Sequence, residues 1–274
     1  MMTTTLRPTA PLHRSADGAR SRPYQVCVNS RPVGTVELAT HPAYGPTVGQ
    51  IRSLHIEEAD RRRGRGTVAA LAAEEVLRGW RCTRVEAQIP ADAKVALRLA
   101  TALGYVERNR AMTKDFTGPA PELPEGCSAR PMTEAEYPAW LDDTKVKYAQ
   151  LWIERGLSEE QAHAKSEREH AEMLPDGLGT PDMWITSLLD GDDLAGTIWV
   201  AGQEQGHYVY WVQVAEAFRG RGHGRTLMVV AEHAARAAGV ERIALNVYTH
   251  NTPALRLYES LGYRPTSYSV HKPL

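Results

Sequence analysis

Cysteine, apolar leader segments and long hydrophobic runs are scarce in this chain, and each scarcity excludes a class of protein. The 274 residues include only three cysteines, Cys27, Cys82 and Cys127, and no CxxC pair. An odd number of unpatterned cysteines argues against a disulfide framework and fits a reducing compartment. The first residues have no apolar stretch that would direct export, and no run approaches the length of a membrane span. We therefore expect a cytoplasmic protein with no membrane partner.

The chain also lacks an excess of positive or of negative charge. The net charge at pH 7 is −1, and no long block of like charge occurs. The one basic cluster consists of the arginines at positions 61, 62, 63 and 65. A nucleic-acid partner is therefore not expected, and an anion-binding loop suits this cluster better. Neither HExxH nor CxxC occurs, so no bound metal is expected.

What the chain does contain is an internal repeat of a whole domain. Residues 61–66 read RRRGRG and residues 219–224 read RGRGHG. A constant offset of 158 aligns residues 61–105 with residues 219–263 without a gap, and 15 of these 45 aligned positions are identical. A repeat of this length indicates two similar domains rather than a solenoid of short units.

The two copies differ at two positions that matter chemically. The second copy has Asn251 and Tyr258, where the first has Ala93 and Ala100. The first copy also has too little chain before Tyr24 for the two helices that open the second. We therefore expect the second copy to be complete and the first to be truncated and degenerate.

The hydrophobic pattern predicts strands and helices that alternate along the chain, which indicates α/β domains. We place the first domain at 1–117, ordered from about residue 23, a proline-rich linker at 118–126, and the second domain at 127–274. The predicted strands are 24–29, 33–39, 49–56, 84–89, 183–189, 194–201, 207–215, 242–248 and 266–272. The predicted helices are 67–79, 92–102, 225–238 and 252–261, with two more at the capping patterns Thr133–Glu136 and Ser158–Gln161.

The strand predicted at 207–215 leads directly into a glycine-rich turn and a helix. Backbone N–H groups at a helix N-terminus lack partners, and the helix dipole favours an anion there. Gly222 and Gly224 let the backbone approach phosphates closely, and Arg219 and Arg221 can add charged contacts. The spacing is neither GxGxxG nor GxxxxGK[ST], so neither a dinucleotide fold nor a P-loop is indicated.

The order of these motifs resembles the GNAT superfamily of N-acetyltransferases. The resemblance rests on Arg-x-x-Gly-x-Gly after a Val-Gln-Val strand, and on the later residues Asn251, Ala254, Leu257, Tyr258, Leu261, Gly262 and Tyr263. It covers 127–274, and residues 24–115 resemble a degenerate domain of the same kind. It implies two GNAT-like domains, each with a mixed, twisted sheet flanked by helices. It also implies acetyl-CoA as co-substrate and acetyl transfer to an amine of a small molecule or peptide. A homodimer is compatible with it.

The resemblance also implies residue roles. The loop that would bind the pyrophosphate of acetyl-CoA consists of Arg219, Gly220, Arg221, Gly222, His223 and Gly224. Val212 and Val214 would bind the pantetheine arm through backbone groups, and Asn251 would contact the same arm. Tyr258 would donate a proton to the departing thiolate.

The general base is not evident, because the strand before the loop has no acid. Residues 207–215 read HYVYWVQVA, and the resemblance implies an acid where Trp211 stands. His207 is the nearest titratable residue and is our candidate base. An amine that is already neutral when bound, or a chain of water molecules, is the alternative.

The aromatic residues and the first copy each allow two interpretations. The six aromatic residues Trp152, Trp184, Trp199, Tyr208, Tyr210 and Trp211 either line an acceptor pocket or simply pack on the sheet. The first copy either still binds CoA or only packs against the second.

Two alternative functions would use the same loop to bind CoA. One is transfer of a larger acyl group, and the other is a CoA-binding sensor without turnover. Tyr258 favours an enzyme, because a pure binder needs no proton donor.

Overall fold

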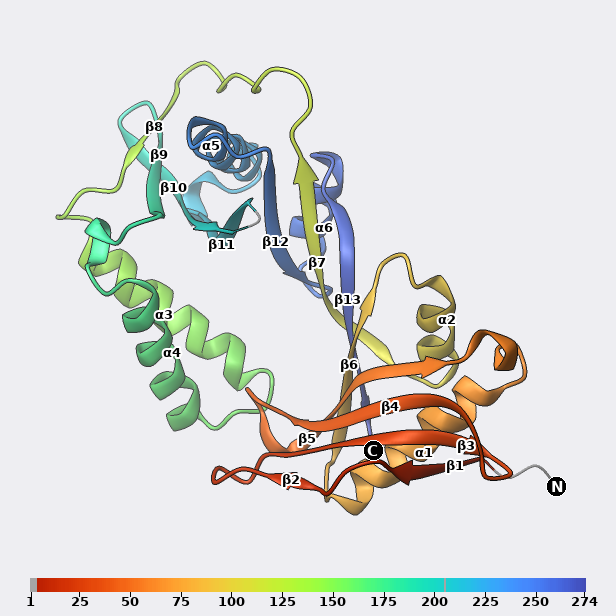
Figure 1. Ribbon diagram of the computed structural model, residues 1–274. Helices are drawn as coiled ribbons and strands as arrows, with labels where there is room; N and C mark the ends of the chain where they lie inside the picture. Colours follow the sequence, from red (N-terminus) through yellow and green to blue (C-terminus); the bar gives the residue numbers. More distant parts are fainter. Residues whose placement is uncertain (1–3, 205) are drawn as a thin grey trace. The chain divides into compact units, whose positions relative to one another are not determined.

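The structure is a computed structural model that describes residues 4–204 and 206–274, and the chain divides into two compact units (Figure 1). Unit 1 comprises the chain up to Ala111 together with Tyr248–His250 and Pro265–Leu274. Unit 2 comprises Met112–Val247 and Asn251–Arg264. Each unit has a mixed sheet flanked by helices, which confirms the predicted α/β class.

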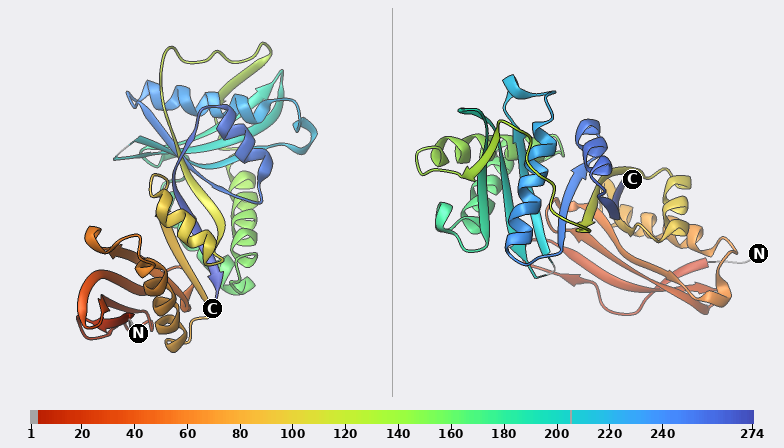
Figure 2. Two further views of the ribbon diagram at one scale, coloured as in Figure 1. Left: turned by 90° about the vertical axis from the view of Figure 1, so that its right-hand side faces the viewer. Right: turned by 90° about the horizontal axis from the view of Figure 1, so that it is seen from above.

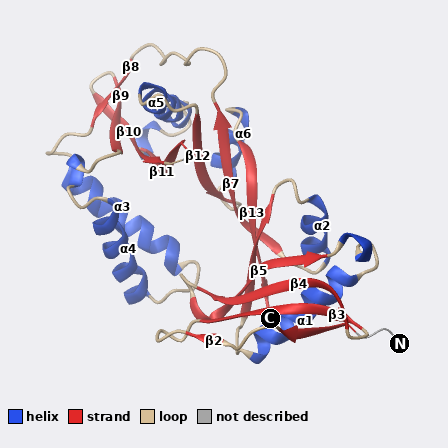
Figure 3. Ribbon diagram, in the orientation of Figure 1, coloured by secondary structure: helices blue, strands red, loops and turns tan. Residues whose placement is uncertain are grey.

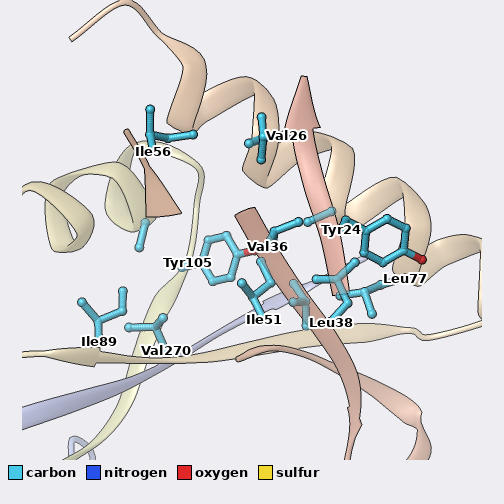
Figure 4. Close-up of a cluster of buried hydrophobic side chains, with 14 of the residues drawn as sticks. Tyr24, Val26, Val36, Leu38, Ile51, Ile56, Leu77, Ile89, Tyr105 and Val270 are labelled. Atoms are coloured by element: carbon cyan, nitrogen blue, oxygen red, sulfur yellow. The ribbon is translucent and has the colours of Figure 1, made fainter. Parts of the chain in front are cut away.

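Unit 1 is built on a sheet with the strand order β1-β3-β4-β5-β6-β13. Its pairs are antiparallel, except that β5 and β6 run parallel. The elements are β1 (Thr4–Pro8), β2 (His13–Arg14), β3 (Arg20–Val28), β4 (Arg31–His41), β5 (Gly45–Ile56), α1 (Arg65–Gly79), β6 (Arg84–Pro90), α2 (Lys94–Ala102) and β13 (Arg264–Pro273). Leu77 of α1 belongs to the same buried cluster as the strand residues Val26, Leu38 and Val270, and lies near Leu38 in Figure 4.

The expectation that order begins near residue 23 is wrong for the described part of the N-terminal segment. Thr4–Pro8 forms β1, which pairs antiparallel with β3 from Thr4 opposite Val28 to Pro8 opposite Tyr24. Leu6 and Leu12 pack against the core of this unit. The polar composition misled the prediction, because an edge strand gains its order from backbone hydrogen bonds to its neighbour.

Unit 2 has the strand order β7-β12-β11-β10-β9-β8, and β7 belongs to it from Met112 onward. Its helices lie on both sides of strands β9 to β11 (Figure 3). The elements are β7 (Val106–Asp115), β8 (Cys127–Pro131), α3 (Tyr137–Ile153), α4 (Glu159–Met173), β9 (Met183–Asp190), β10 (Asp193–Gln203), β11 (Gly206–Val214), α5 (His223–Ala237), β12 (Arg242–Tyr248) and α6 (Thr252–Ser260).

Unit 2 has two buried clusters, and successive side chains of β10 point alternately into one and the other. Ile198 and Val200 belong to the cluster that includes Leu227 of α5, whereas Trp199 between them belongs to the cluster that includes Trp140 of α3. Successive side chains of a strand point to opposite faces of its sheet. Helix α5 therefore covers one face, as Figure 2 also shows, and α3 covers the other.

The two capping patterns give different outcomes. Ser158 and Gln161 form a complete capping box, and α4 begins at the next residue, as predicted. Thr133 and Glu136 also pair, with the Thr133 backbone N–H donating to Glu136 at 2.8 Å. The helix nevertheless begins only at Tyr137, because residues 133–136 form a turn and the Glu136 carboxylate is also bound by Arg130.

The last strands of the two repeats are exchanged, β13 from Pro265 onward and β7 from Met112 onward. Val270 on β13 is buried in the core of unit 1, whereas Met112 on β7, its counterpart in the repeat, is buried in the core of unit 2. The Phe116 backbone N–H, just after β7, donates to the backbone carbonyl oxygen of Glu241 at 2.9 Å. The compact units are therefore not contiguous in sequence. The domain ranges 1–117 and 127–274 remain a prediction about the repeat itself.

Candidate active site

Strands β11 and β12 of unit 2 separate along their length. They pair in parallel at only three positions, from His207 opposite Ile243 to Val209 opposite Leu245, although β11 continues to Val214. The separation coincides with a β-bulge. On the other side of β11, Trp211 lies opposite Trp199 and Val209 lies opposite Val200, so Tyr210 is an extra residue. A bulge bends its strand and increases the twist, which directs the last residues of β11 away from β12.

Val212 and Val214 lie on this diverging segment. Their side chains pack against the cluster below α5. Their backbone groups lie beyond the last paired position with β12, at the place where a ligand arm could hydrogen-bond as an added strand does.

The loop from Arg219 to Gly222 connects this strand to α5. Gly220 and Gly222 have φ angles of +78° and +92°, and Gly222 is the N-cap of α5. A Cβ atom at either glycine would meet no atom within 4 Å, so the backbone here is open to an approaching group. Arg219 and Arg221 are exposed beside it. A helix N-terminus with open backbone and two cations is an anion-binding arrangement.

Gly224 has a different reason for its size. A Cβ atom at this position would lie 3.3 Å from Leu257 of α6 and 3.9 Å from Val214 of β11. The first turn of α5, the end of the diverging strand and helix α6 therefore meet at Gly224. This contact places the anion-binding loop next to the helix that contains Tyr258.

His223 contributes differently from its neighbours in the loop. Its side chain is buried, with Nε2 lying 3.3 Å from the Asp190 carboxylate and the ring meeting Phe218 edge-on at 5.7 Å between centroids. The imidazole thus faces the interior, and only the backbone N–H of His223 is placed to meet an anion at the start of α5.

Asn251 is the N-cap of α6. Its side-chain oxygen accepts a hydrogen bond from the Ala254 backbone N–H at 3.2 Å. Sequence reasoning assigned this residue to the ligand alone. The structure adds a local role, and the two hydrogen atoms of the amide nitrogen remain available to donate to a ligand.

Tyr258 lies in the second turn of α6 and is 9% exposed. Its ring lies 5.7 Å from that of Tyr263. Burial raises the pKa of the Tyr258 phenol to about 12, so the group stays protonated across the neutral range. A phenol in this state can donate a proton but cannot serve as a base.

His207, the candidate base, lies away from these groups along β11. It occupies the paired part of the strand, opposite Ile243, and its ring stacks on Trp184 at 4.6 Å. The side chain is buried, and burial lowers the pKa of its imidazole. The structure brings Val212, Val214, the loop and α6 together, but it does not bring His207 to them.

Unit 1 has a similar backbone conformation at the corresponding loop, but it lacks the polar side chains of Asn251 and Tyr258. Gly64 is the N-cap of α1 with φ +72°, and Arg62 keeps a φ of +58° where the second copy has Gly220. Ala93 precedes α2 without a side-chain cap, and Ala100 fills the position of Tyr258.

The corresponding end of unit 1 also contains an acid. Asp60 is buried and binds Arg31 through two hydrogen bonds of 2.7 and 2.9 Å, and it also pairs with Arg65. The charge of Arg65 is therefore engaged internally at the start of α1. This arrangement weakens the loop of unit 1 as an anion site relative to that of unit 2.

The aromatic residues divide between core and surface. Trp152 and Trp199 are buried, and Trp184 stacks on His207, so these three pack the sheet and helices. Tyr210, by contrast, is 36% exposed, and Trp211 is half-buried beside it on the face towards α3.

Sequence reasoning missed Asp143. This residue lies on α3, and its carboxylate accepts a hydrogen bond of 2.9 Å from Gln213 on the diverging part of β11. No local motif marks it, since the contact joins residues 70 positions apart. The structure therefore supplies a carboxylate near the strand that has none of its own.

Neither a metal-binding cluster nor a membrane-spanning helix occurs in residues 4–204 and 206–274. No group of three or more His, Cys, Asp or Glu side chains there could hold a metal ion. No helix in the same residues is long and apolar enough to cross a membrane.

Comparison with known proteins agrees with this geometry. The sequence model of the Acetyltransferase (GNAT) family matches twice, at residues 3–105 and 140–263. An uncharacterized N-acetyltransferase of Bacillus subtilis, YycN, is 30% identical over 53% of this chain and 96% of its own length. A mycothiol acetyltransferase of Rhodococcus erythropolis is 30% identical over 77% of this chain and 71% of its own length.

Solved structures show the same fold. A GCN5-related N-acetyltransferase from Sphaerobacter thermophilus superposes with a TM-score of 0.55 over 92% of this chain and 80% of its own, at 21% identity. A tandem GNAT protein from the clavulanic acid biosynthesis pathway superposes with a TM-score of 0.50 over 95% of this chain and 85% of its own, at 19% identity.

Proposed function

Because this chain belongs to the GNAT acetyltransferase family, we propose that unit 2 transfers the acetyl group of acetyl-CoA to an amine of a small molecule or peptide. The observation that carries the proposal is the meeting of three elements at Gly224. They are the anion-binding start of α5, the diverging end of β11, and α6 with its protonated Tyr258.

The residues of unit 2 fit acetyl-CoA. Gly220 and Gly222 leave an open backbone at the N-terminus of α5, and Arg219 and Arg221 supply positive charge for a pyrophosphate. The diverging backbone at Val212 and Val214 suits the amide groups of a pantetheine arm. The amide nitrogen of Asn251 would donate to the same arm.

Acetyl-CoA, when bound, supplies the thioester carbonyl and a thiolate as the leaving group. A backbone N–H of the diverging segment near Val212 would donate to the carbonyl oxygen, where negative charge develops. Tyr258 would donate its phenolic proton towards the sulfur. Water in the separated strand region would receive the proton that the amine loses, because His207 is buried in the paired part of β11.

Thiol release from acetyl-CoA tests the proposal. Wild-type protein would be mixed with acetyl-CoA and a panel of amines, including amines related to mycothiol because relatives are named for it. Tyr258→Phe should lower turnover roughly 10²–10⁴-fold with little change in acetyl-CoA affinity. Tyr263→Phe removes a hydroxyl from the neighbouring buried ring and serves as the matched control.

Three outcomes would each argue against part of the proposal. Equal turnover by wild type and Tyr258→Phe would remove Tyr258 as the proton donor. Tight binding of acetyl-CoA without turnover of any amine would instead favour a CoA-binding sensor. Faster release from a longer acyl-CoA would assign a different donor to the same loop.

A further inference from the structure

The diverging segment of β11 is joined to helix α3 by a chain of hydrogen bonds. The Trp211 indole N–H donates to the Gln213 side-chain oxygen at 3.0 Å. The Gln213 amide nitrogen then donates to a carboxylate oxygen of Asp143 at 2.9 Å. Trp211 and Gln213 point to the same side of the strand, the face covered by α3. Asp143 is therefore held at the strand segment proposed above for acetyl-CoA.

The Asp143 carboxylate is accessible and ionised. Its side chain is 44% exposed, and its other charged partner is Lys147, one turn along α3 at 2.6 Å. Burial raises the pKa of Asp143, but hydrogen bonds from Lys147 and Gln213 outweigh it and lower the pKa overall. The pair with Lys147 is an exposed i,i+4 pair, which a second cation can replace at little cost.

Aromatic rings lie on the same face as this carboxylate. Tyr210, the extra residue of the bulge, stacks on Trp199 at 5.2 Å between centroids and leaves 36% of its surface exposed. Trp211 follows it and is half-buried. A carboxylate on the same face as partly exposed aromatic rings is a combination that recognises organic ammonium groups, through an ion pair and through cation–π attraction.

We propose that Asp143 is an acceptor-binding residue, and that the acceptor is a molecule that carries an ammonium group. This inference rests on the acetyltransferase function proposed above. A carboxylate whose pKa is lowered is a poor proton acceptor, so Asp143 recognises charge rather than acting as the general base. It supplies from α3 the negative charge that β11 lacks.

Unit 1 shows why this site belongs to unit 2 alone. Its strand β5 has the same bulge, with Arg52 as the extra residue, and diverges from β6 in the same way. In its described residues no helix precedes β3, so nothing corresponds to α3 or to Asp143. His55 stands where unit 2 has Gln213.

The experiment compares Asp143→Asn with wild type, using 2-phenylethylamine as a cationic acceptor and aniline as a neutral one. The variant keeps the size of the side chain and its acceptor oxygen for Gln213. We expect KM for 2-phenylethylamine to rise about 10–100-fold in Asp143→Asn, since a hydrogen bond to a charged group is lost. The kcat for 2-phenylethylamine, and both kcat and KM for aniline, should stay within about twofold of the wild-type values. Asp142→Asn removes the same charge from an exposed neighbour and should leave every constant unchanged.

A second measurement does not require turnover. The same amines would be titrated calorimetrically into the protein loaded with CoA, and wild type should bind 2-phenylethylamine at least tenfold more tightly than Asp143→Asn does. Equal affinities, or no binding of the cation to wild type, would overturn the inference. A fall in kcat with unchanged KM would also overturn it and give Asp143 a role in proton transfer. Failure of acetyl-CoA itself to react with any amine would instead contradict the function proposed above.

Discussion

The Lys272 ammonium group lies 2.7 Å from the carboxylate of Glu74, which is almost fully buried in α1 of unit 1. The same contact recurs in unit 2, where Lys114 lies 2.6 Å from Glu232 of α5. The two lysines are counterparts in the repeat, with an offset of 158, and so are the two glutamates. In each pair, however, the lysine comes from one copy of the repeat and the glutamate from the other. In each unit an ion pair therefore joins the exchanged last strand to the helix of the other copy, which stabilises the exchanged arrangement.

Removing either lysine should destabilise the protein. Lys272→Ala would leave the buried Glu74 without its nearest cationic partner, which we expect to cost about 2–3 kcal/mol, because the lysine itself is partly exposed. Lys114→Ala should cost less in unit 2, because Arg236 still donates two hydrogen bonds of 2.8 and 2.9 Å to Glu232. Chemical denaturation measures both. Arg242→Ala breaks the exposed pair with Asp115 and should change stability by less than about 1 kcal/mol. Equal losses in all three variants would contradict this interpretation.

A negative charge at position 222 should weaken the binding of acetyl-CoA without lowering the stability of the fold. Asn and Asp both tolerate the φ of +92° better than other residues, and they have the same shape. Gly222→Asp should bind acetyl-CoA at least about tenfold more weakly than Gly222→Asn, because its charge repels the pyrophosphate. Its melting temperature should be no lower, since an acid favours a helix N-terminus.

The same pair of substitutions at Gly64 provides the control. Gly64→Asp and Gly64→Asn should bind acetyl-CoA equally, as measured by calorimetry on the full chain. If only the Gly64 pair differed in affinity, the cofactor would lie in unit 1.

Asn251 should prove to have two separable roles. Asn251→Ala loses the cap of α6 and should cost about 1 kcal/mol of stability. Asn251→Ser restores an oxygen that can cap the helix but offers no amide donor to a ligand. We expect the serine variant to regain stability in thermal melts while KM for acetyl-CoA stays raised. Recovery of both properties would assign Asn251 to the cap alone.

Acid should weaken one contact at the start of α3. Hydrogen bonds from Arg130 lower the pKa of Glu136 to about 2. A carboxyl group with a depressed folded pKa stabilises the protein above its unfolded pKa, near 4.5, and this contribution is lost as the pH falls towards 2. Glu136→Gln should therefore be less stable than wild type by about 1 kcal/mol at pH 7, after allowing for solvent screening.

Denaturation at several pH values checks the sign of this effect. The difference between wild type and Glu136→Gln should shrink between pH 5 and pH 2. A difference that is constant with pH would mean that shape, rather than charge, accounts for the loss.

Much of the fold could be predicted because its signals are local. The glycine-rich turn, the amphipathic helix after it and the alternating strands are each specified within a short window, and α5 and β12 lie close to where they were expected. The offset of 158 predicted a second domain without any structure. The strands β1 and β7 were missed, since polar residues dominate them and their order comes from pairing with distant segments.

The sequence by itself determined that two related α/β domains exist, that only the second has Asn251 and Tyr258, and that a glycine-rich loop with Arg219 and Arg221 precedes α5. Only the tertiary structure decided that β7 and β13 change places, that the His223 ring faces Asp190, and that Asp143 meets Gln213. The physical reason is the range of the interactions. Turns and helices follow from neighbours in the chain, whereas a strand's partner and a side chain's contact depend on which distant segments bury the same surface.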